Sequence, residues 1–533
     1  MTSTALARVV VEALLGAGVR HVVLAPGSRN APLSFALHDA ATAGALTLHT
    51  RIDERTAAFL ALGIARSSKQ PAAVVTTSGT AAANLHPAVM EAAHTGLPLV
   101  AVTADRPARL RGTIANQTTD QVGLFGSAVV TASDVVDAVD VAEGLAGLSR
   151  GPVHLNVQLD EPLVPADHAT PSVHRPDELE PGRGDPLGLE PGPATVVVAG
   201  DDAGPAARLL AESANWPLLA EPTSGARNGG HVIRTYRLLL GTPLAERIER
   251  VVVLGSPTLS RPVQRLLSRD GLDVVVRRPR GVWADRPHPV TREHDGPFAV
   301  AAPDDPAWLD EWRSADRALA AGLDALVAAE AELTPYDVAA AVNAAVPPGG
   351  LLHVGASNPI RDLDLMAKPY PVGERRLVIA NRGLAGIDGT LSSAIGAALG
   401  RPHTTRAIGY VGDVTFLHDL TALVIGPDEA RPDLTLVVAN DDGGSIFATL
   451  EQGAPDHAAE FDKLFGTPHG VDLAAVCTGL RVPHWRVHDR AELAHALANP
   501  NGGIEVVEAV VRRDNRRALD ERIRALATGP ASP

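Results

Sequence analysis

The feature that most restricts the fold is a repeated alternation of short apolar runs with helical segments along almost the whole chain. Short apolar runs bounded by turn residues are typical of buried strands, and the segments of helical periodicity between them indicate crossover helices. Such βαβ units form parallel sheets with helices on both faces. The predicted fold class is therefore α/β, with doubly wound parallel sheets.

The alternation occurs in three blocks, and a chain of 533 residues is too long for one hydrophobic core. We predict a first domain at 1–165, a linker at 166–193, a central domain at 194–333 and a third domain at 334–533. The linker is rich in Pro, Gly, Asp and Glu and has no periodicity. The predicted strands are 21–25, 46–50, 72–76, 97–103 and 153–157, then 195–199, 217–220, 250–254 and 272–276, and finally 351–354, 376–379, 407–411, 434–439 and 503–510.

Composition excludes several classes of function. The net charge of −15 argues against nucleic acid as a partner, because phosphate binding needs a basic face. No apolar run approaches the ~20 residues that span a bilayer, so membrane insertion is not expected. Residues 2–18 have helical spacing with Arg8 and Glu12 among apolar residues, unlike a signal peptide, and we expect a cytoplasmic protein.

Cysteine and lysine are scarce. The single cysteine, Cys477, excludes an intrachain disulfide and any multi-cysteine metal site, and its apolar neighbours favour a buried structural thiol. The three lysines all lie outside Gly-rich loops, which disfavours nucleotide hydrolysis of the Walker type. Schiff-base chemistry, which needs a desolvated lysine, is also poorly supported.

Two polar segments carry the clearest chemical signal. Gly412-Asp413 and the segment 440–444 (Asn-Asp-Asp-Gly-Gly) each follow a predicted strand directly, and 28 residues separate Asp413 from Asp441. Ligands bind beyond the carboxyl ends of parallel strands, so the helix expected at 415–425 would bring both polar ends to one edge. Carboxylate oxygens suit Mg²⁺, which leaves positions open for phosphates. The alternative for a lone Gly-Asp is a turn or a helix cap.

A second signal lies in the first block, where Asp53-Glu54 follows a predicted strand and precedes an Ala-rich segment. Asp53 is suited to cap the helix and Glu54 to complement its dipole. In the functional alternative, a partly buried Glu54 exchanges a proton with a cofactor ring.

The two segments at 412–413 and 440–444 resemble the metal and diphosphate motif of thiamine diphosphate-dependent enzymes, in which Gly-Asp-Gly precedes Asn-Asn by a little under thirty residues. Val414 departs from the third motif position, and Asp441 stands where Asn is usual, which leaves Asn440 as a competing ligand. The order of motifs resembles one branch, the MenD family of 2-succinyl-5-enolpyruvyl-6-hydroxy-3-cyclohexene-1-carboxylate synthases. These further motifs are APGSRNAP at 25–32, TTSGTA at 76–81, TADRP at 103–107, NQ at 116–117, GASNPIR at 355–361, NRGLAGIDG at 381–389 and GSIF at 444–447.

The resemblance implies three domains of the thiamine diphosphate-dependent decarboxylase type and a role for each matched residue. Glu54 would be catalytic, and Asp413, Asp441 and the Gly443 carbonyl would hold Mg²⁺ or Mn²⁺. The implied cofactor-binding residues are Pro26, Gly27, Ser78, Ile387, Gly412, Asp413, Val414, Asp441, Gly443 and Ile446. The implied substrate-binding residues are Ser28, Arg29, Arg106, Asn116, Gln117, Arg261, Ser357, Arg361, Arg382, Phe447 and Leu450. Arginine suits this role because guanidinium groups bind carboxylates in a two-pronged geometry.

The resemblance also implies a reaction in menaquinone biosynthesis: 2-oxoglutarate is decarboxylated on thiamine diphosphate, and the succinyl group is added to isochorismate. Glu54 and Asp413 lie in different predicted domains, and in the family they meet across two chains, so a homodimer or homotetramer is implied. One alternative is another enzyme of the superfamily, such as an acetohydroxyacid synthase or a simple 2-oxo acid decarboxylase. Another is a metabolite-binding regulator that lost the chemistry, which the retention of Glu54, Asp413 and Asp441 disfavours.

Overall fold

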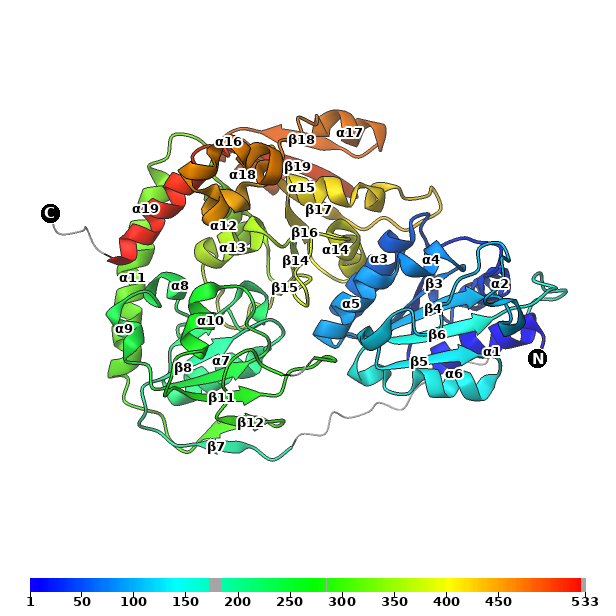
Figure 1. Ribbon diagram of the computed structural model, residues 1–533. Coiled ribbons are helices and arrows are strands. Elements are labelled where there is room, and N and C mark those ends of the chain that lie inside the picture. The colour runs from blue at the N-terminus through cyan, green and yellow to red at the C-terminus, as the bar shows by residue number, and fades with distance from the viewer. Residues whose placement is uncertain (172–183, 284, 529–533) are drawn as a thin grey trace.

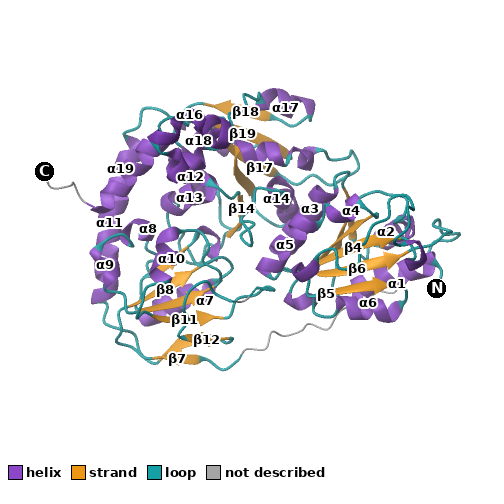
Figure 2. Cartoon of the chain, viewed as in Figure 1, coloured by secondary structure: helices purple, strands orange, loops and turns teal. Residues whose placement is uncertain are grey.

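The computed structural model describes residues 1–171, 184–283 and 285–528. It contains three large sheets of parallel strands with helices packed around them, which confirms the predicted α/β fold class (Figure 1). The first sheet lies to the right in Figure 2, the second at the lower left and the third at the top. The three large sheets fall within the three predicted domains, whose boundaries stay a prediction. Residues 172–183 of the predicted linker lie outside the described part, and residues 187–189 of that linker form a short strand instead of a segment without regular structure.

The first sheet has the strand order β2-β1-β3-β4-β6-β5. Its strands are β1 (His21–Leu24), β2 (Thr47–Thr50), β3 (Ala72–Thr76), β4 (Leu99–Asp105), β5 (Thr131–Val135) and β6 (Val153–Gln158). Its helices are α1 (Ser3–Gly16), α2 (Ala31–Thr42), α3 (Glu54–Ser68), α4 (Thr80–Ala83), α5 (His86–Thr95) and α6 (Ala138–Leu145). The helix predicted at 2–18 is α1.

The second sheet has the order β12-β11-β10-β8-β9, and a small parallel pair joins β13 to β7. The strands are β7 (Leu187–Leu189), β8 (Thr195–Ala199), β9 (Leu218–Ala220), β10 (Arg250–Leu254), β11 (Asp273–Arg277), β12 (Arg292–His294) and β13 (Phe298–Val300). The helices are α7 (Pro205–Ala214), α8 (Tyr236–Leu239), α9 (Pro243–Glu246), α10 (Arg261–Leu267) and the long α11 (Ala307–Ala328). Helix α11 leads towards the third sheet.

The third sheet has the order β15-β14-β16-β17-β19-β18. Its strands are β14 (Leu351–Val354), β15 (Leu377–Ile379), β16 (Ala407–Gly412), β17 (Leu434–Asn440), β18 (His484–Val487) and β19 (Ile504–Val510). Its helices are α12 (Pro335–Ala345), α13 (Asn358–Met366), α14 (Thr390–Leu399), α15 (Asp413–His418), α16 (Ala458–Phe461), α17 (Leu473–Gly479), α18 (Arg490–Ala498) and α19 (Arg516–Thr528).

The packing of α3 on α14 joins the first sheet's layer to that of the third. Glycines on both helices allow the close approach: a Cβ on Gly63 would lie 2.1 Å from the Ser393 carbonyl oxygen, and one on Gly396 would lie 2.1 Å from that of Leu60. The apolar core around these helices contains residues of both layers, such as Phe59 and Leu391. This packing fixes how the first and third sheets lie relative to each other within one chain.

One local prediction needs correction and two are confirmed. The helix expected at 415–425 begins earlier, as α15 at Asp413, and is followed by a separate 3₁₀ turn at Leu420–Leu423. Asp53 caps α3, since its side chain accepts a hydrogen bond from the Thr56 amide at 3.1 Å. Cys477 is buried, and burial raises the pKa of its thiol to about 11.

Candidate active site

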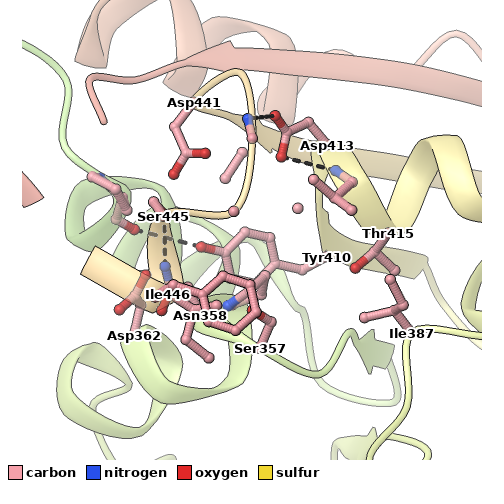
Figure 3. A pocket seen from close by; sticks show the side chains of 18 residues that line it. Ser357, Asn358, Asp362, Ile387, Tyr410, Asp413, Thr415, Asp441, Ser445 and Ile446 are labelled. Carbon is pink, nitrogen blue, oxygen red and sulfur yellow. Dashed lines mark hydrogen bonds between the residues drawn. The ribbon is translucent and has the colours of Figure 1, made fainter. Parts of the chain in front are cut away.

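A cavity of about 150 Å³ opens at the carboxyl ends of β16 and β17 (Figure 3). The two strands are neighbours, with Gly412 paired to Ala439, so the polar segments that follow them meet there as predicted. The lining residues are Pro335, Ser357, Asn358, Pro359, Asp362, Ile387, Tyr410, Gly412, Asp413, Val414, Thr415, Ala439, Asp441, Gly443, Gly444, Ser445, Ile446 and Phe447. All of them come from the third sheet and the elements around it.

Asp413, the first residue of α15, is buried at the wall of this cavity. One carboxylate oxygen, Oδ1, accepts a hydrogen bond from the Val414 amide at 2.8 Å. The other, Oδ2, accepts one from the Gly443 amide at 2.8 Å and lies 3.0 Å from Nε2 of His469. Burial raises the pKa of Asp413, and these hydrogen bonds oppose that rise.

Asp441 stands beside Asp413 on the next loop. Burial, together with the negative charge of Asp413, raises the pKa of Asp441 to about 7. Two carboxyl groups that disfavour each other's ionisation form a site that a divalent cation would relieve. Asn440 points elsewhere: its amide donates to Glu508 Oε1 at 2.7 Å, and its carbonyl oxygen accepts from the Asp442 amide at 3.0 Å. Of the two competing ligands, the geometry favours Asp441.

One half of the predicted site lines this cavity. Seven of the predicted cofactor-binding residues line it, together with two of the substrate-binding residues. They are Ile387, Gly412, Asp413, Val414, Asp441, Gly443 and Ile446, with Ser357 and Phe447. Leu450 is absent from the lining: it follows the 3₁₀ turn Ser445–Thr449, and its carbonyl accepts a hydrogen bond from Arg517 at 3.2 Å.

The other half of the predicted site gathers at the carboxyl edge of the first sheet. Ser78 donates to the Gln117 carbonyl at 2.8 Å, and the Gln117 side chain donates to the Ser78 carbonyl at 2.9 Å. Arg106 donates to the same Gln117 carbonyl at 3.2 Å, whereas Asn116 is exposed. Glu54 begins α3, is half-buried and accepts a hydrogen bond from Asn84 at 3.4 Å.

The residues after β1 lie at the same edge. A Cβ on Gly27 would be 2.4 Å from Cβ of Thr77, so the loop carrying Pro26, Gly27 and Ser28 packs directly on the loop after β3. Arg29 donates to the Leu159 carbonyl at 3.1 Å. Burial and the nearby positive charge of Arg106 lower the pKa of Arg29. The positive charges of Arg29 and Arg106 thus act on each other, and the carboxylates of Asp105, Asp160 and Glu161 also act on Arg29.

A second pair of arginines lies near the third sheet. Arg361 donates to the Ser357 carbonyl at 2.6 Å, and burial and the charge of Arg382 lower its pKa. Arg382 is buried and donates to Thr258 at 3.1 Å, while its Nε has no hydrogen-bond partner among the described residues. Arg261 is exposed and pairs with Glu451 at 2.7 Å, so the structure does not direct it into the cavity.

Sequence reasoning missed two residues that hold this site. One is His469, which contacts Asp413. The other is Glu91 of α5, whose two carboxylate oxygens accept the amides of Gly383 and Leu384 at 2.6 and 2.7 Å. These amides directly follow Arg382, so Glu91 fixes the start of the loop that also carries Ile387. No local signal marks either residue, because both contacts join segments far apart in the chain.

Comparison with known proteins accounts for this arrangement. Residues 4–124 match the thiamine pyrophosphate enzyme, N-terminal TPP binding domain, and residues 364–507 match the C-terminal TPP binding domain of the same enzymes. A 2-succinyl-5-enolpyruvyl-6-hydroxy-3-cyclohexene-1-carboxylate synthase of Nocardioides sp. (strain ATCC BAA-499 / JS614) is 64% identical, over 98% of each chain. The chain belongs to the family of these synthases. Synthases of the same name from Kineococcus radiotolerans and Saccharopolyspora erythraea are 47% and 43% identical, over 98% and 99% of each chain.

The predicted family, cofactor and enzymatic function are thereby confirmed: the protein is a thiamine diphosphate-dependent synthase of this family. Its cavity fits a diphosphate group held through a divalent cation. A Cβ on Gly412 would meet no atom within 4 Å, so free space adjoins the backbone beside Asp413. The described residues contain no cluster of three or more His, Cys, Asp or Glu side chains able to hold a metal. Among the described residues, every helix is too short or too polar to cross a bilayer.

Proposed function

We propose that the synthase decarboxylates 2-oxoglutarate and adds the succinyl group to isochorismate, giving 2-succinyl-5-enolpyruvyl-6-hydroxy-3-cyclohexene-1-carboxylate and CO2 in menaquinone biosynthesis. The observation that carries this proposal is the cavity with paired Asp413 and Asp441 in a chain of this family. Thiamine diphosphate, when bound, supplies the electron sink for decarboxylation. The protein's own residues bind, orient and move protons around it.

In this proposal Asp413, Asp441 and the Gly443 carbonyl hold Mg²⁺ or Mn²⁺, which binds the diphosphate. Hard divalent cations prefer such oxygen donors. The neighbouring backbone of Gly412 and Val414 leaves room for the phosphates, and Ile387 and Ile446 provide apolar walls. Pro26, Gly27 and Ser78 would line the other end of the cofactor.

The two arginine pairs support substrates that carry several carboxylates. None of Arg29, Arg106, Arg361 and Arg382 forms an ion pair with a carboxylate in the described part of the chain, so their charges are available to ligands. Pyruvate-type substrates have one carboxylate and would not need four arginines. Ser28, Asn116, Gln117, Ser357 and Phe447 complete the proposed substrate set, whereas Arg261 would first have to leave Glu451.

Glu54 is the proposed catalytic residue. This half-buried carboxyl group at the start of α3 would exchange a proton with the aminopyrimidine ring of bound cofactor. Glu54 does not line the cavity that contains Asp413, so we propose that a second copy of the chain completes each site, in a homodimer or homotetramer. Co-expression of Glu54→Gln with Asp441→Ala tests this: shared sites should restore about a quarter of the activity, because half of the random dimers carry one intact site. Complete inactivity of the mixture would refute shared sites.

The reaction is tested by isochorismate consumption with the purified protein, thiamine diphosphate, Mg²⁺ and 2-oxoglutarate, beside a control in which pyruvate replaces 2-oxoglutarate. Loss of isochorismate only with 2-oxoglutarate is the expected result. Decarboxylation without loss of isochorismate would instead favour another enzyme of the superfamily. We also propose that the protein is cytoplasmic and that it does not bind nucleic acid.

A further inference from the structure

The imidazole of His469 contacts Asp413, a proposed ligand of the cation, and the position of its proton can be assigned. The Val471 amide donates a hydrogen bond to Nδ1 of His469 at 3.0 Å. An amide can only donate, so Nδ1 accepts, although it also lies 3.4 Å from Asp442 Oδ1. The neutral imidazole therefore carries its proton on Nε2 and donates it to Asp413 Oδ2 at 3.0 Å.

This donation determines which oxygen of Asp413 is left for a cation. A carboxylate has about four acceptor positions, two on each oxygen. On Oδ2 one position is taken by the Gly443 amide and the other by His469. On Oδ1 only one is taken, by the Val414 amide. The remaining position is on Oδ1, so the imidazole fixes both the rotation of the carboxylate and the oxygen that can bind.

The backbone around His469 is itself held against the loop that carries Asp441. The Asp442 side chain accepts hydrogen bonds from the amides of His469 and Gly470, at 3.1 and 2.8 Å. The Gly444 amide donates to the Gly466 carbonyl at 2.7 Å, and a Cβ on Gly443 would come within 2.1 Å of that carbonyl oxygen. The imidazole is thus anchored to the Asp441 loop through the backbone and to Asp413 through its ring.

We propose that His469 is a positioning residue for the cation site: it joins the two loops that carry the ligands and orients Asp413 before the cation arrives. The imidazole side chain is 14% exposed and the Asp413 side chain 3% exposed, so solvent does not readily replace their hydrogen bond. Hydrogen bonds to metal ligands hold those ligands in place, and their loss typically weakens metal binding about 10- to 100-fold. The proposal rests on the proposed function, in that it takes Asp413 as a ligand.

The test measures cation affinity without turnover. Mg²⁺ is titrated calorimetrically into the full-length protein with excess thiamine diphosphate and no substrate, for the unaltered protein, His469→Ala and His469→Gln. We expect His469→Ala to bind Mg²⁺ about 10- to 100-fold more weakly. His469→Gln should stay within a few-fold of the unaltered protein, because the amide nitrogen of glutamine replaces the Nε2 donor.

The matched control is His168→Ala, which removes an exposed histidine–carboxylate contact of 2.7 Å between the predicted linker and Asp39 of α2. It should leave the Mg²⁺ affinity unchanged. Unchanged affinity in His469→Ala would overturn the proposal, and so would equal weakening in the Ala and Gln variants, since only the donor distinguishes them. Failure of the proposed function would be seen separately, as no loss of isochorismate with the unaltered protein in the assay described above, a result that the Mg²⁺ affinities of the variants do not imitate.

Discussion

Replacement of Glu221 by glutamine should stabilise the protein at alkaline pH but not at acidic pH. Glu221 follows β9 and is 2% exposed, and its Oε1 accepts the Leu259 amide at 2.9 Å. Its Oε2 has no partner among the described residues. Burial, partly offset by that hydrogen bond and by the charge of Arg382, raises the pKa of Glu221 from 4.5 to about 8. The folded protein therefore keeps a proton that the unfolded chain releases between these values.

The sign follows from proton linkage. Between pH 4.5 and about 8 the folded state binds more protons than the unfolded state, so the free energy of unfolding decreases as the pH rises. At about 1.4 kcal/mol per unit of pKa, a shift of this size costs roughly 4 to 5 kcal/mol of stability near pH 8 and almost nothing below pH 4.5. Glutamine keeps the Oε1 acceptor and has no proton to release, so its advantage should grow with pH.

Thermal unfolding measured from pH 5 to 8.5 checks this reasoning. We expect the midpoint of Glu221→Gln to exceed that of the unaltered protein by several degrees at pH 8.5, with little difference at pH 5. Glu246→Gln, an exposed carboxylate of the same predicted domain, is the matched control and should show no such trend. A difference between Glu221→Gln and the unaltered protein that does not change with pH would refute the argument.

Three further substitutions test the site. Glu54→Gln should lower turnover by about 10²- to 10⁴-fold while Mg²⁺ affinity and the melting temperature stay unchanged; steady-state rates and calorimetry check this, and an unchanged rate would contradict the assigned role. Asp441→Ala should abolish Mg²⁺-dependent cofactor binding. It should also raise the melting temperature of the cofactor-free protein, because it removes the repulsion between Asp441 and Asp413. A lower melting temperature would argue against that repulsion. Glu91→Gln removes one of the two carboxylate acceptors for the amides after Arg382, a loss of a charged hydrogen bond of about 1.5 to 3 kcal/mol. We expect the KM for a carboxylate substrate to rise more than kcat falls. Equal changes in KM and kcat would argue against this role of Glu91.

The sequence identifies the central strands of each sheet because they are buried on both faces. Strands such as β3, β8 and β10 are buried along their whole length, so their sequences are apolar runs apart from one terminal residue each. The missed strands β5, β12 and β18 lie at sheet edges, where one neighbour is lacking and polar residues replace the apolar run. The pair β7 and β13 was missed for a different reason: each strand has only three residues, too few to form a recognisable apolar run.

The candidate site likewise contains residues that the sequence predicts and residues that it does not. Asp413 and Asp441 could be predicted because each follows a recognisable strand and adjacent parallel strands end at one edge. His469 could not, since its contact with Asp413 spans 56 residues through a segment without regular periodicity. Glu91 lies on the buried face of α5, and its role depends on how the first domain packs against a loop almost three hundred residues later. Only the tertiary structure brings these residues together.

The relation between α3 and α14 bears on the proposal that two chains share each site. Glu54 begins α3, and the same helix is locked against α14 through glycines that bring backbone into contact with backbone. Glu54 does not line the cavity at Asp413, and a shift of α3 towards that cavity would disturb the buried contact with α14 and its apolar core. Association of a second copy leaves the packing intact and can present one chain's Glu54 to the other's cavity. The cost of opening the α3–α14 contact thus favours a shared site over closure within one chain.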